Sequence, residues 1–319
     1  MSTMRRNKLG SRYYTSLTCK VIILGHAIQG ESAILILSDG ADIVYTCIVD
    51  SFTSNDRIVA KEILQGLGIT QITDLFWTHP HDDHSDGIIE LIETFSPENV
   101  FLATELQSLP ENSSSISSDV LNRINTYKSY DRRIKYAPKV QGIGTNYTIY
   151  SETLQVGSKL VPFTMFTIAP SSGWVRKKAI NDQFNSLNDF SLVFSVNIGD
   201  FSVLLTGDIQ NRMIDAANED LCQNVYTPNL LKIPHHGSKD SINILNFFDE
   251  EEVIDYGITT AKKSSGLPRE DALESYRTRC HHTYQIDPES KQCAVWGLEV
   301  DILSGTAETL VCKSFIECS

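Results

Sequence analysis

The sequence predicts an α/β fold in which two β-rich halves, each followed by helices, are compatible with a duplicated sandwich. Short apolar, β-branched runs separated by turns recur in 19–50 and again in 141–205. Apolar residues at helical spacing follow in 55–68 and 88–95 after the first half. A third observation concerns function, because three predicted strands end in histidine or aspartate, and sites assemble at the carboxyl ends of strands.

The first half divides into short elements. Three strands are expected to form an antiparallel meander, and a helix capped by Asn55 or Asp56 then runs to Gly68. The remaining elements of this half are a buried strand, a helix and another strand. The predicted ranges are strands at 19–24, 33–37, 43–49, 74–78 and 99–102 and helices at 55–68 and 88–95.

The second half begins after a polar stretch and a helix expected over 119–127. Ile198-Gly199-Asp200 is predicted to be a tight hairpin turn between two strands. The strand-like segments are 147–154, 160–168, 191–196 and 201–205, and a helix is expected at 209–219.

Composition limits the class of protein. The chain has 319 residues, 41% hydrophobic and 21% charged, which is ordinary for a globular protein with one large domain or two smaller ones. The formal net charge of −13 would repel nucleic acid and anionic membranes, so a polyanion would have to meet a locally positive site.

The cysteines and the N-terminal segment indicate a compartment. Seven cysteines, an odd number without Cys-x-x-Cys spacing, favour free thiols in a reducing environment over a disulfide framework. The first eight residues are followed by no apolar core, and no run of eighteen apolar residues occurs. We therefore expect a soluble cytoplasmic protein.

The most informative stretch is 75–87, where an apolar strand ends in a His-x-His-x-Asp-His pattern formed by His79, His81, Asp83 and His84. Imidazole and carboxylate ligands at this spacing favour zinc, iron or manganese. His79 and His81 point the same way on extended chain, whereas the adjacent Asp83 and His84 must point apart or serve a second ion. The alternative is a polar turn with Asp83 or Ser85 as a helix N-cap.

Two further strand ends repeat this logic. Asp208 follows the apolar strand 201–205, where its carboxylate could bridge two ions or cap the next helix. His235 and His236 follow the apolar run 229–233 and could supply one ligand and one acid or hydrogen-bond donor. Three such strand ends together predict a shared site.

Other polar clusters allow two interpretations. Basic residues cluster at 128–139 and 174–178. They either lie in a solvated surface helix and a loop or bind an anionic substrate. The first cluster consists of Lys128, Arg132, Arg133, Lys135 and Lys139. His26 is expected in a loop or the core, and His281-His282 at the surface.

The three motifs together resemble the metallo-β-lactamase superfamily. Within it, the chain looks most like the hydrolase domain of ComEC-type DNA-uptake proteins, on the stretches 25–34, 188–193 and 231–238. The resemblance spans roughly 19–260, with 103–140 as an insertion. It implies a single α/β domain over 1–319, a four-layer αββα sandwich with the metals at one edge of the two sheets.

The resemblance also implies two divalent ions, zinc or alternatively manganese. His79, His81 and Asp208 would hold one ion. Asp83, His84, Asp208 and one of His235 and His236 would hold the other, with His235 taken as the ligand. Asn188 and Ser238 would contact the substrate. Two departures are a missing histidine between His84 and Asp208, which leaves one ion an open position, and a missing late histidine at 264–268.

The implied activity is that of a metal-dependent phosphodiesterase or nuclease acting through a metal-bridging hydroxide. Asp83 would orient the water or accept its proton, and His236 would stabilise charge or protonate the leaving group. The expected partner is a phosphodiester or another small anionic substrate, a class to which nucleic acid belongs. No membrane partner is expected. The alternatives are a hydrolase of a small ester, lactone or thioester, and a metal-stabilised regulatory protein with little catalysis.

Overall fold

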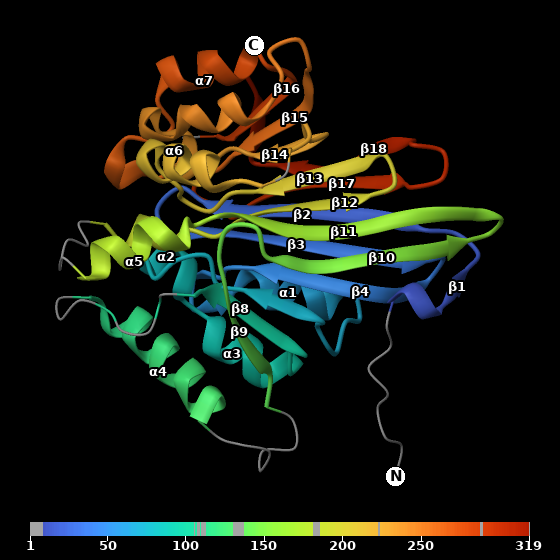
Figure 1. Ribbon diagram of the computed structural model, residues 1–319, viewed down its shortest axis with the longest axis horizontal. Coiled ribbons are helices and arrows are strands. Elements are labelled where there is room, and N and C mark those ends of the chain that lie inside the picture. The colour runs from blue at the N-terminus through green and yellow to red at the C-terminus, as the bar shows by residue number, and fades with distance from the viewer. Residues whose placement is uncertain are drawn as a thin grey trace.

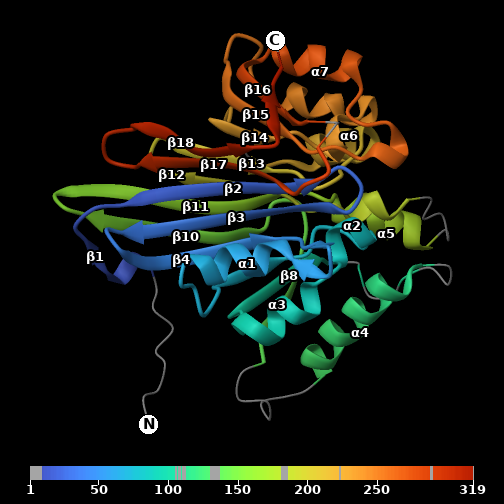
Figure 2. The ribbon, with the colours of Figure 1, turned by 180° about the vertical axis from the view of Figure 1, so that it is seen from behind.

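Two large β-sheets lie face to face, with helices on the outer side of each (Figures 1 and 2). The predicted four-layer αββα sandwich is confirmed. The computed structural model describes residues 9–104, 106, 109, 113–129, 137–180, 186–222, 224–287 and 290–318.

One sheet has eight strands within these ranges, in the order β18-β17-β2-β3-β4-β7-β8-β9. The strands β2, β3 and β4 form the predicted antiparallel meander, and β4, β7, β8 and β9 are mutually parallel. Their bounds are β2 (Thr18–His26), β3 (Gly30–Asp39), β4 (Asp42–Val49), β7 (Asp74–Phe76), β8 (Asn99–Ala103), β9 (Lys139–Ile143), β17 (Ala294–Asp301) and β18 (Ala307–Lys313).

The other sheet has nine strands in the same described part, in the order β1-β10-β11-β12-β13-β14-β15-β16-β19. The strands β13 to β16 are parallel, and Gly199 makes the predicted hairpin between β12 and β13. Their bounds are β1 (Tyr13–Tyr14), β10 (Thr148–Val156), β11 (Lys159–Ala169), β12 (Val193–Ile198), β13 (Phe201–Leu205), β14 (Leu230–Lys232), β15 (Ile254–Thr259), β16 (Cys280–Ile286) and β19 (Phe315–Glu317).

Helices cover both outer faces (Figure 1). The first sheet is flanked by α1 (Val59–Gly66), α3 (Ile88–Phe95) and α4 (Ser115–Ser129), and the second by α6 (Asn211–Asp220), the 3-10 segment η4 (Lys239–Phe247) and α7 (Glu270–Arg277). The helices α2 (Asp82–Ser85) and α5 (Ser172–Ile180) lie together at one end of the sandwich in both views. Short elements complete the fold: η1 (Leu9–Ser11), β5 (Thr53–Ser54), β6 (Arg57–Ile58), η2 (Leu187–Phe190), η3 (His235–Gly237) and η5 (Lys263–Ser265).

Three local predictions need correction. Asn55 and Asp56 do not cap α1, because both adopt positive φ in the turn between β5 and β6, and Ile58 is the N-cap. The basic segment 174–178, predicted to be a loop, lies in α5. In the predicted insertion at 103–140, α4 is longer than expected.

Some predictions fall outside the described residues. These include Arg132, Arg133 and Lys135 of the basic cluster and part of the polar stretch before α4. The single domain over 1–319 also stays a prediction.

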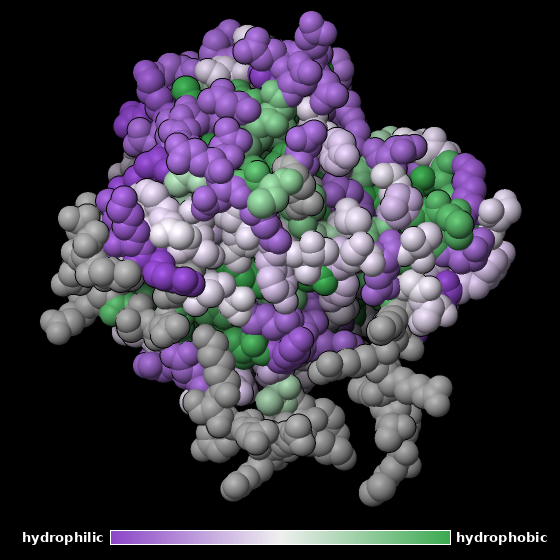
Figure 3. All heavy atoms as spheres, in the orientation of Figure 1, coloured by the Kyte–Doolittle hydropathy of each residue, from purple (hydrophilic) through white to green (hydrophobic). Residues whose placement is uncertain are grey.

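The surface and the cysteines agree with the composition. All seven cysteines are free, as predicted. In the described part of the chain, no helix is long and apolar enough to cross a membrane. The face shown in Figure 3 is largely hydrophilic, with hydrophobic residues in scattered patches.

An aromatic contact joins the two sheets. The fully buried ring of Phe76 on β7 stacks on Phe194 of β12, with ring centroids 4.2 Å apart, and on Phe101 of β8 at 4.6 Å. Because Phe76 immediately precedes the 77–84 loop, this packing fixes where the motif leaves the core.

We expect Phe194→Ala to lower the free energy of unfolding by about 3–5 kcal/mol, because it leaves a cavity between the sheets. Urea unfolding followed by circular dichroism measures this loss. Tyr226→Ala, at a side chain that is 73% exposed, is the control and should change stability by about 0.5 kcal/mol or less. Equal effects of the two substitutions would contradict the proposed role of the contact.

Candidate metal centre

The parallel strands of both sheets bring their carboxyl ends to one edge of the sandwich. Asp50 follows β4, the segment 79–84 follows β7, Asp208 follows β13, and His235-His236 follow β14. Gly207, with φ of +51°, allows the loop after β13 to pass Thr78, since a Cβ there would lie 3.0 Å from the Thr78 side chain. The predicted convergence of the three motifs is therefore present in the fold.

Three groups of histidine and aspartate side chains at this edge could hold a metal ion, and one of them is Asp50, His79 and His84. The larger of the two groups that contain Asp208 consists of Asp83, His84, Asp208 and His236, whose ligand atoms all lie within 4.8 Å of one another. His236 Nε2 is 3.3 Å from Asp208 Oδ2 and 3.4 Å from Asp83 Oδ2. His84 Nε2 is 3.5 Å from Asp208 Oδ1 and 3.9 Å from Asp83 Oδ2. Two imidazoles and two carboxylates thus surround one point, which is a complete ligand set for a zinc-type ion.

The second group consists of His79, His81 and Asp208. His79 Nε2 lies 3.1 Å from His81 Nδ1 and 3.9 Å from Asp208 Oδ2. Asp208 belongs to both groups, so its carboxylate lies where a bridging ligand would be. This group has three members rather than four, in agreement with the missing histidine noted in the sequence.

Buried polar atoms that form no hydrogen bond indicate that these residues fit a cation. Both carboxylate oxygens of Asp208 and the Nε2 atoms of His84 and His236 are buried and form no hydrogen bond. Burying such atoms without a partner costs free energy, and native structures contain few of them. Four of them around one point indicate a site that a divalent cation would complete.

The charges around this point agree with that fit. Burial opposes charge on His84 and His236, yet Asp208 with Asp50 holds the pKa of His84 well above its ordinary value, and Asp208 with Glu31 raises the pKa of His236 to about 9. Burial also opposes ionisation of Asp208, but His236 and His84 keep its pKa well below its ordinary value. The carboxylates therefore stabilise positive charge on their partners, and a metal ion would replace those protons.

Asp50, which was not identified from the sequence, contacts the first motif on the side that faces the core. Asp50 Oδ2 lies 2.8 Å from His84 Nδ1 and accepts a hydrogen bond from the Thr78 hydroxyl at 2.6 Å. The Thr78 hydroxyl in turn lies 2.9 Å from His79 Nδ1. Such carboxylate–histidine contacts orient the ring of a metal-binding histidine and fix its tautomer.

A second buried network supports His236. Its Nδ1 atom lies 2.9 Å from the Thr260 hydroxyl and 3.3 Å from Glu31 Oε2. Glu31 also pairs with Lys232 at 2.8 Å, and both residues are almost fully buried. This network directs Nε2 of His236 toward Asp83 and Asp208.

The backbone at 235–237 explains how two adjacent histidines come to differ. His235, His236 and Gly237 all have positive φ, at 49°, 52° and 73°, which is uncommon for non-glycine residues and is found at functional sites. The turn brings His236 into the larger ligand group, while His235 Nε2 lies 3.3 Å from Asn188 Nδ2. Among the described residues, none of the three ligand groups contains His235, the histidine expected as the ligand.

The remaining candidates are placed as follows. Asn188 is buried beside His235, whereas the Ser238 hydroxyl caps η4 by accepting a hydrogen bond from the Asp240 N–H at 3.2 Å. Asp208 does not cap α6, whose N-cap is Gln210. His26 is buried at the end of β2, and His281 and His282 are exposed on β16, as expected for a core and two surface histidines.

Five residues of the site were missed: Asp50, Glu31, Lys232, Thr260 and Lys262. Asp50, Thr260 and Lys262 follow the ends of β4 and β15, so the rule that found Asp208 could have found them. Glu31 lies near the start of β3 and Lys232 is the last residue of β14, and both pair with segments far away in the chain, which the strand pattern does not indicate.

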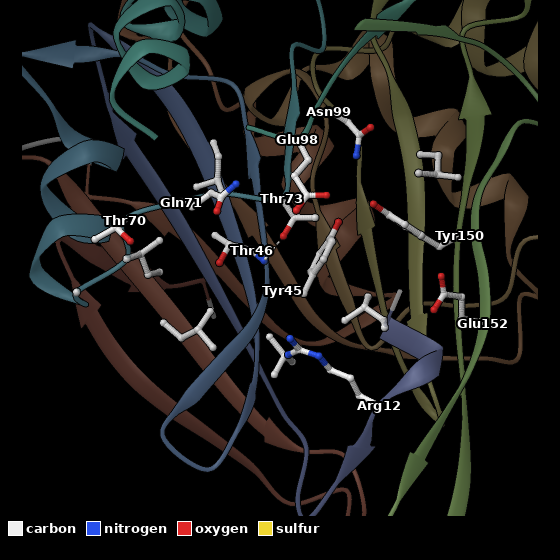
Figure 4. Close-up of a pocket in the computed structure, with 17 residues that line it drawn as sticks. Arg12, Tyr45, Thr46, Thr70, Gln71, Thr73, Glu98, Asn99, Tyr150 and Glu152 are labelled. Atoms are coloured by element: carbon white, nitrogen blue, oxygen red, sulfur yellow. Dashed lines mark hydrogen bonds between the residues drawn. The ribbon is translucent and has the colours of Figure 1, made fainter. Parts of the chain in front are cut away.

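A cavity of about 620 Å³ lies away from this centre, where β7 and β8 begin rather than end (Figure 4). Tyr45 and Tyr150 line it, and their hydroxyls both donate to Oδ2 of the buried Asp74, at 2.7 and 2.8 Å. Asn99 donates to the other oxygen at 2.8 Å. Burial outweighs these three hydrogen bonds and raises the pKa of Asp74 to about 6.

Comparisons with known proteins agree with the fold. Residues 30–137, which contain the first metal motif, match the family model of the metallo-beta-lactamase superfamily. This finding supports the superfamily predicted from the motifs. A search of curated proteins gives no match. None of the comparisons identifies the ComEC-like branch, which stays a prediction.

Solved structures show only distant similarity. A diphosphatase of the PhnP family has 11% identity and a TM-score of 0.41, over 88% of this chain and 98% of that chain. A metallo hydrolase from the archaeon Ignicoccus hospitalis has 11% identity and a TM-score of 0.38, over 76% and 81%. Zinc-bound PqqB from Methylobacterium extorquens has 12% identity and a TM-score of 0.36, over 80% and 76%. With TM-scores below 0.5, these similarities assign no function to the chain.

Asp74 makes stability depend on pH. Because its folded-state pKa of about 6 exceeds its ordinary value, the folded protein binds more protons between pH 4 and pH 6. The contribution of Asp74 to the free energy of unfolding therefore falls as the pH rises from 4 to 6, by about 1.4 kcal/mol per pH unit. Above pH 6 this contribution is constant.

Asp74→Asn should remove this fall, as measured by urea unfolding at pH 4, 5, 6 and 7. Asp42→Asn, at an exposed aspartate, serves as the control and should keep the wild-type profile. An unchanged slope in the Asp74→Asn protein would show that another group is responsible.

Metal stoichiometry tests the two ligand groups separately. We expect the wild-type protein to bind two divalent ions, His81→Ala to bind one, and Asp208→Ala to bind none tightly, because only Asp208 belongs to both groups. Elemental analysis after dialysis measures the content, and circular dichroism checks that each variant is folded. Equal losses in the two variants would contradict the assignment of His81 to the smaller group alone.

Proposed function

We propose that the chain is a hydrolase that uses two divalent metal ions, zinc or manganese, to cleave phosphodiester bonds. The position of Asp208 in two adjacent ligand groups is the observation that carries the proposal. When bound, a pair of ions lowers the pKa of water toward neutrality and withdraws charge from the oxygens of the attacked group. The ComEC-like motifs found in the sequence support phosphodiester as the bond.

The ligand roles follow from the contacts. We assign His79, His81 and Asp208 to one ion and Asp83, His84, Asp208 and His236 to the other. Asp50 and the Glu31–Thr260 pair hold the imidazoles of His84 and His236 in place. His236 replaces His235 in this assignment because its Nε2 atom lies between the two carboxylates.

With His236 as the ligand, His235 takes the role that the sequence suggested for His236, which is to stabilise charge or protonate the leaving group. Burial lowers the pKa of His235, so its ring is neutral near pH 7 and can donate one N–H. It lies beside the Asn188 amide at the edge of the centre, so the two can position the phosphoryl oxygens or stabilise charge on the leaving group. Asp83, paired with His236 and less buried than Asp208, is the carboxylate that can orient the attacking water. Burial opposes its ionisation, but His236 and His84 hold its pKa well below its ordinary value, so it is a weak proton acceptor.

The partner we propose is a phosphodiester or another small anionic molecule. Nucleic acid belongs to this class but has to overcome the net charge of −13, so binding would depend on a locally positive site. We propose no membrane partner.

Protein loaded with zinc or manganese should hydrolyse bis-p-nitrophenyl phosphate, with release of p-nitrophenol as the measurement. Asp208→Ala should lower kcat/KM by at least about a thousandfold, because it removes the shared ligand. Asp200→Ala, at an exposed position in the β12–β13 turn, should keep wild-type activity.

A panel of DNA, RNA, a lactone and a thioester would separate the competing functions. Hydrolysis of the lactone or thioester alone would favour a carboxylic ester hydrolase. A sample that holds two ions and cleaves nothing in the panel would favour a metal-stabilised regulatory protein.

A further inference from the structure

We propose that Lys262 is the residue that binds the anionic group of the substrate, an inference that rests on the proposed function. Lys262 lies after β15, the strand next to β14, and Nζ is 2.7 Å from Asp83 Oδ2. The structure thus brings a cation to the larger ligand group from a segment 24 residues or more beyond the sequence motifs.

Exposure places Lys262 at the mouth of the centre. The side chains of His84, Asp208 and His236 are 0–1% exposed, that of Asp83 is 14% exposed and that of Lys262 is 25% exposed. Exposure therefore increases from the buried ligands through Asp83 to Lys262. A molecule that approaches the ligand group from solvent would meet this ammonium group on its way.

The backbone holds Lys262 in a fixed position. Its N–H and C=O both bond to Leu267, with N–H···O distances of 3.1 and 3.2 Å, and the following N–H of Lys263 donates to Ala27 O at 2.7 Å. The end of this loop is joined to the histidine turn, because Arg269 N–H donates to Gly237 O at 3.0 Å. A lysine on such a closed loop loses less conformational freedom on binding than one on a free loop.

The charge balance decides what Lys262 can do. In the described part of the centre, the carboxylates of Asp50, Asp83, Asp208 and Glu31 outnumber the ammonium groups of Lys232 and Lys262. Two divalent cations would reverse the sign of this excess. Lys232 is buried against Glu31, so Lys262 is the lysine of the pair that faces solvent and can pair with an incoming anion.

The position of Lys262 narrows the class of substrate that the site would accept. A fixed ammonium group beside the reacting centre favours a substrate that carries a phosphoryl charge over a neutral lactone or thioester. It also gives a function to the loop that contains 264–268, where a late histidine was expected and is missing.

The test compares three variants of the full-length, metal-loaded protein. Lys262→Gln removes the charge, Lys262→Arg keeps it, and Lys263→Gln removes an equal charge from the exposed neighbouring residue. Titration calorimetry with inorganic phosphate measures anion affinity, and elemental analysis measures metal content. We expect about tenfold weaker phosphate binding in Lys262→Gln, which equals about 1.4 kcal/mol, with two ions retained. Lys262→Arg and Lys263→Gln should stay within about threefold of wild type.

Steady-state kinetics with bis-p-nitrophenyl phosphate add a second measurement, in which Lys262→Gln should raise KM more than it lowers kcat. Unchanged phosphate affinity in Lys262→Gln, or absence of phosphate binding to the wild type, would overturn the inference. A loss of metal in Lys262→Gln would overturn it too, since Lys262 would then only hold Asp83. Lys262-dependent phosphate binding without any hydrolysis would refute the proposed function and keep the inference.

Discussion

The buried carboxylate of Asp208 is the constraint on which the site depends. It lies in the core at the end of β13, in contact with imidazoles from two distant loops, and neither of its oxygens forms a hydrogen bond. A buried carboxylate without partners is costly, so the surrounding residues must supply positive charge. This need for positive charge explains the raised pKa values of His84 and His236. It also explains why ligand groups lie on both sides of Asp208.

The sandwich stabilises this arrangement because residues on the core side of the ligands hold their side chains in position. Asp50 fixes His84, the Glu31–Lys232 pair with Thr260 fixes His236, and the stack of Phe76 on Phe194 fixes the start of the first motif. The left-handed turn at 235–237 stores backbone strain that this surrounding structure has to offset. Stability and preorganisation of the centre therefore come from the same contacts.

The two ends of the parallel strands have different roles. At their carboxyl ends, charged side chains converge on one point and leave polar atoms unused. Where β7 begins, the buried Asp74 has three hydrogen-bond donors and belongs to the framework of the fold. Burial alone therefore does not identify a functional carboxylate, whereas unused atoms next to other ligands do.

The sequence did not indicate β15 to β19, and its resemblance to a known family implied the four-layer sandwich. By itself it determined most strands and helices within 19–233 and the strand ends at which His79–His84, Asp208 and His235-His236 occur. Local periodicity carries this information, because a strand that enters the core must end at its edge. Only the tertiary structure decided which of His235 and His236 joins the ligands, since that depends on three positive φ angles. It also revealed Glu31 and Lys232, whose partners lie far away in the chain, and it placed Lys262, which follows the end of β15, beside Asp83.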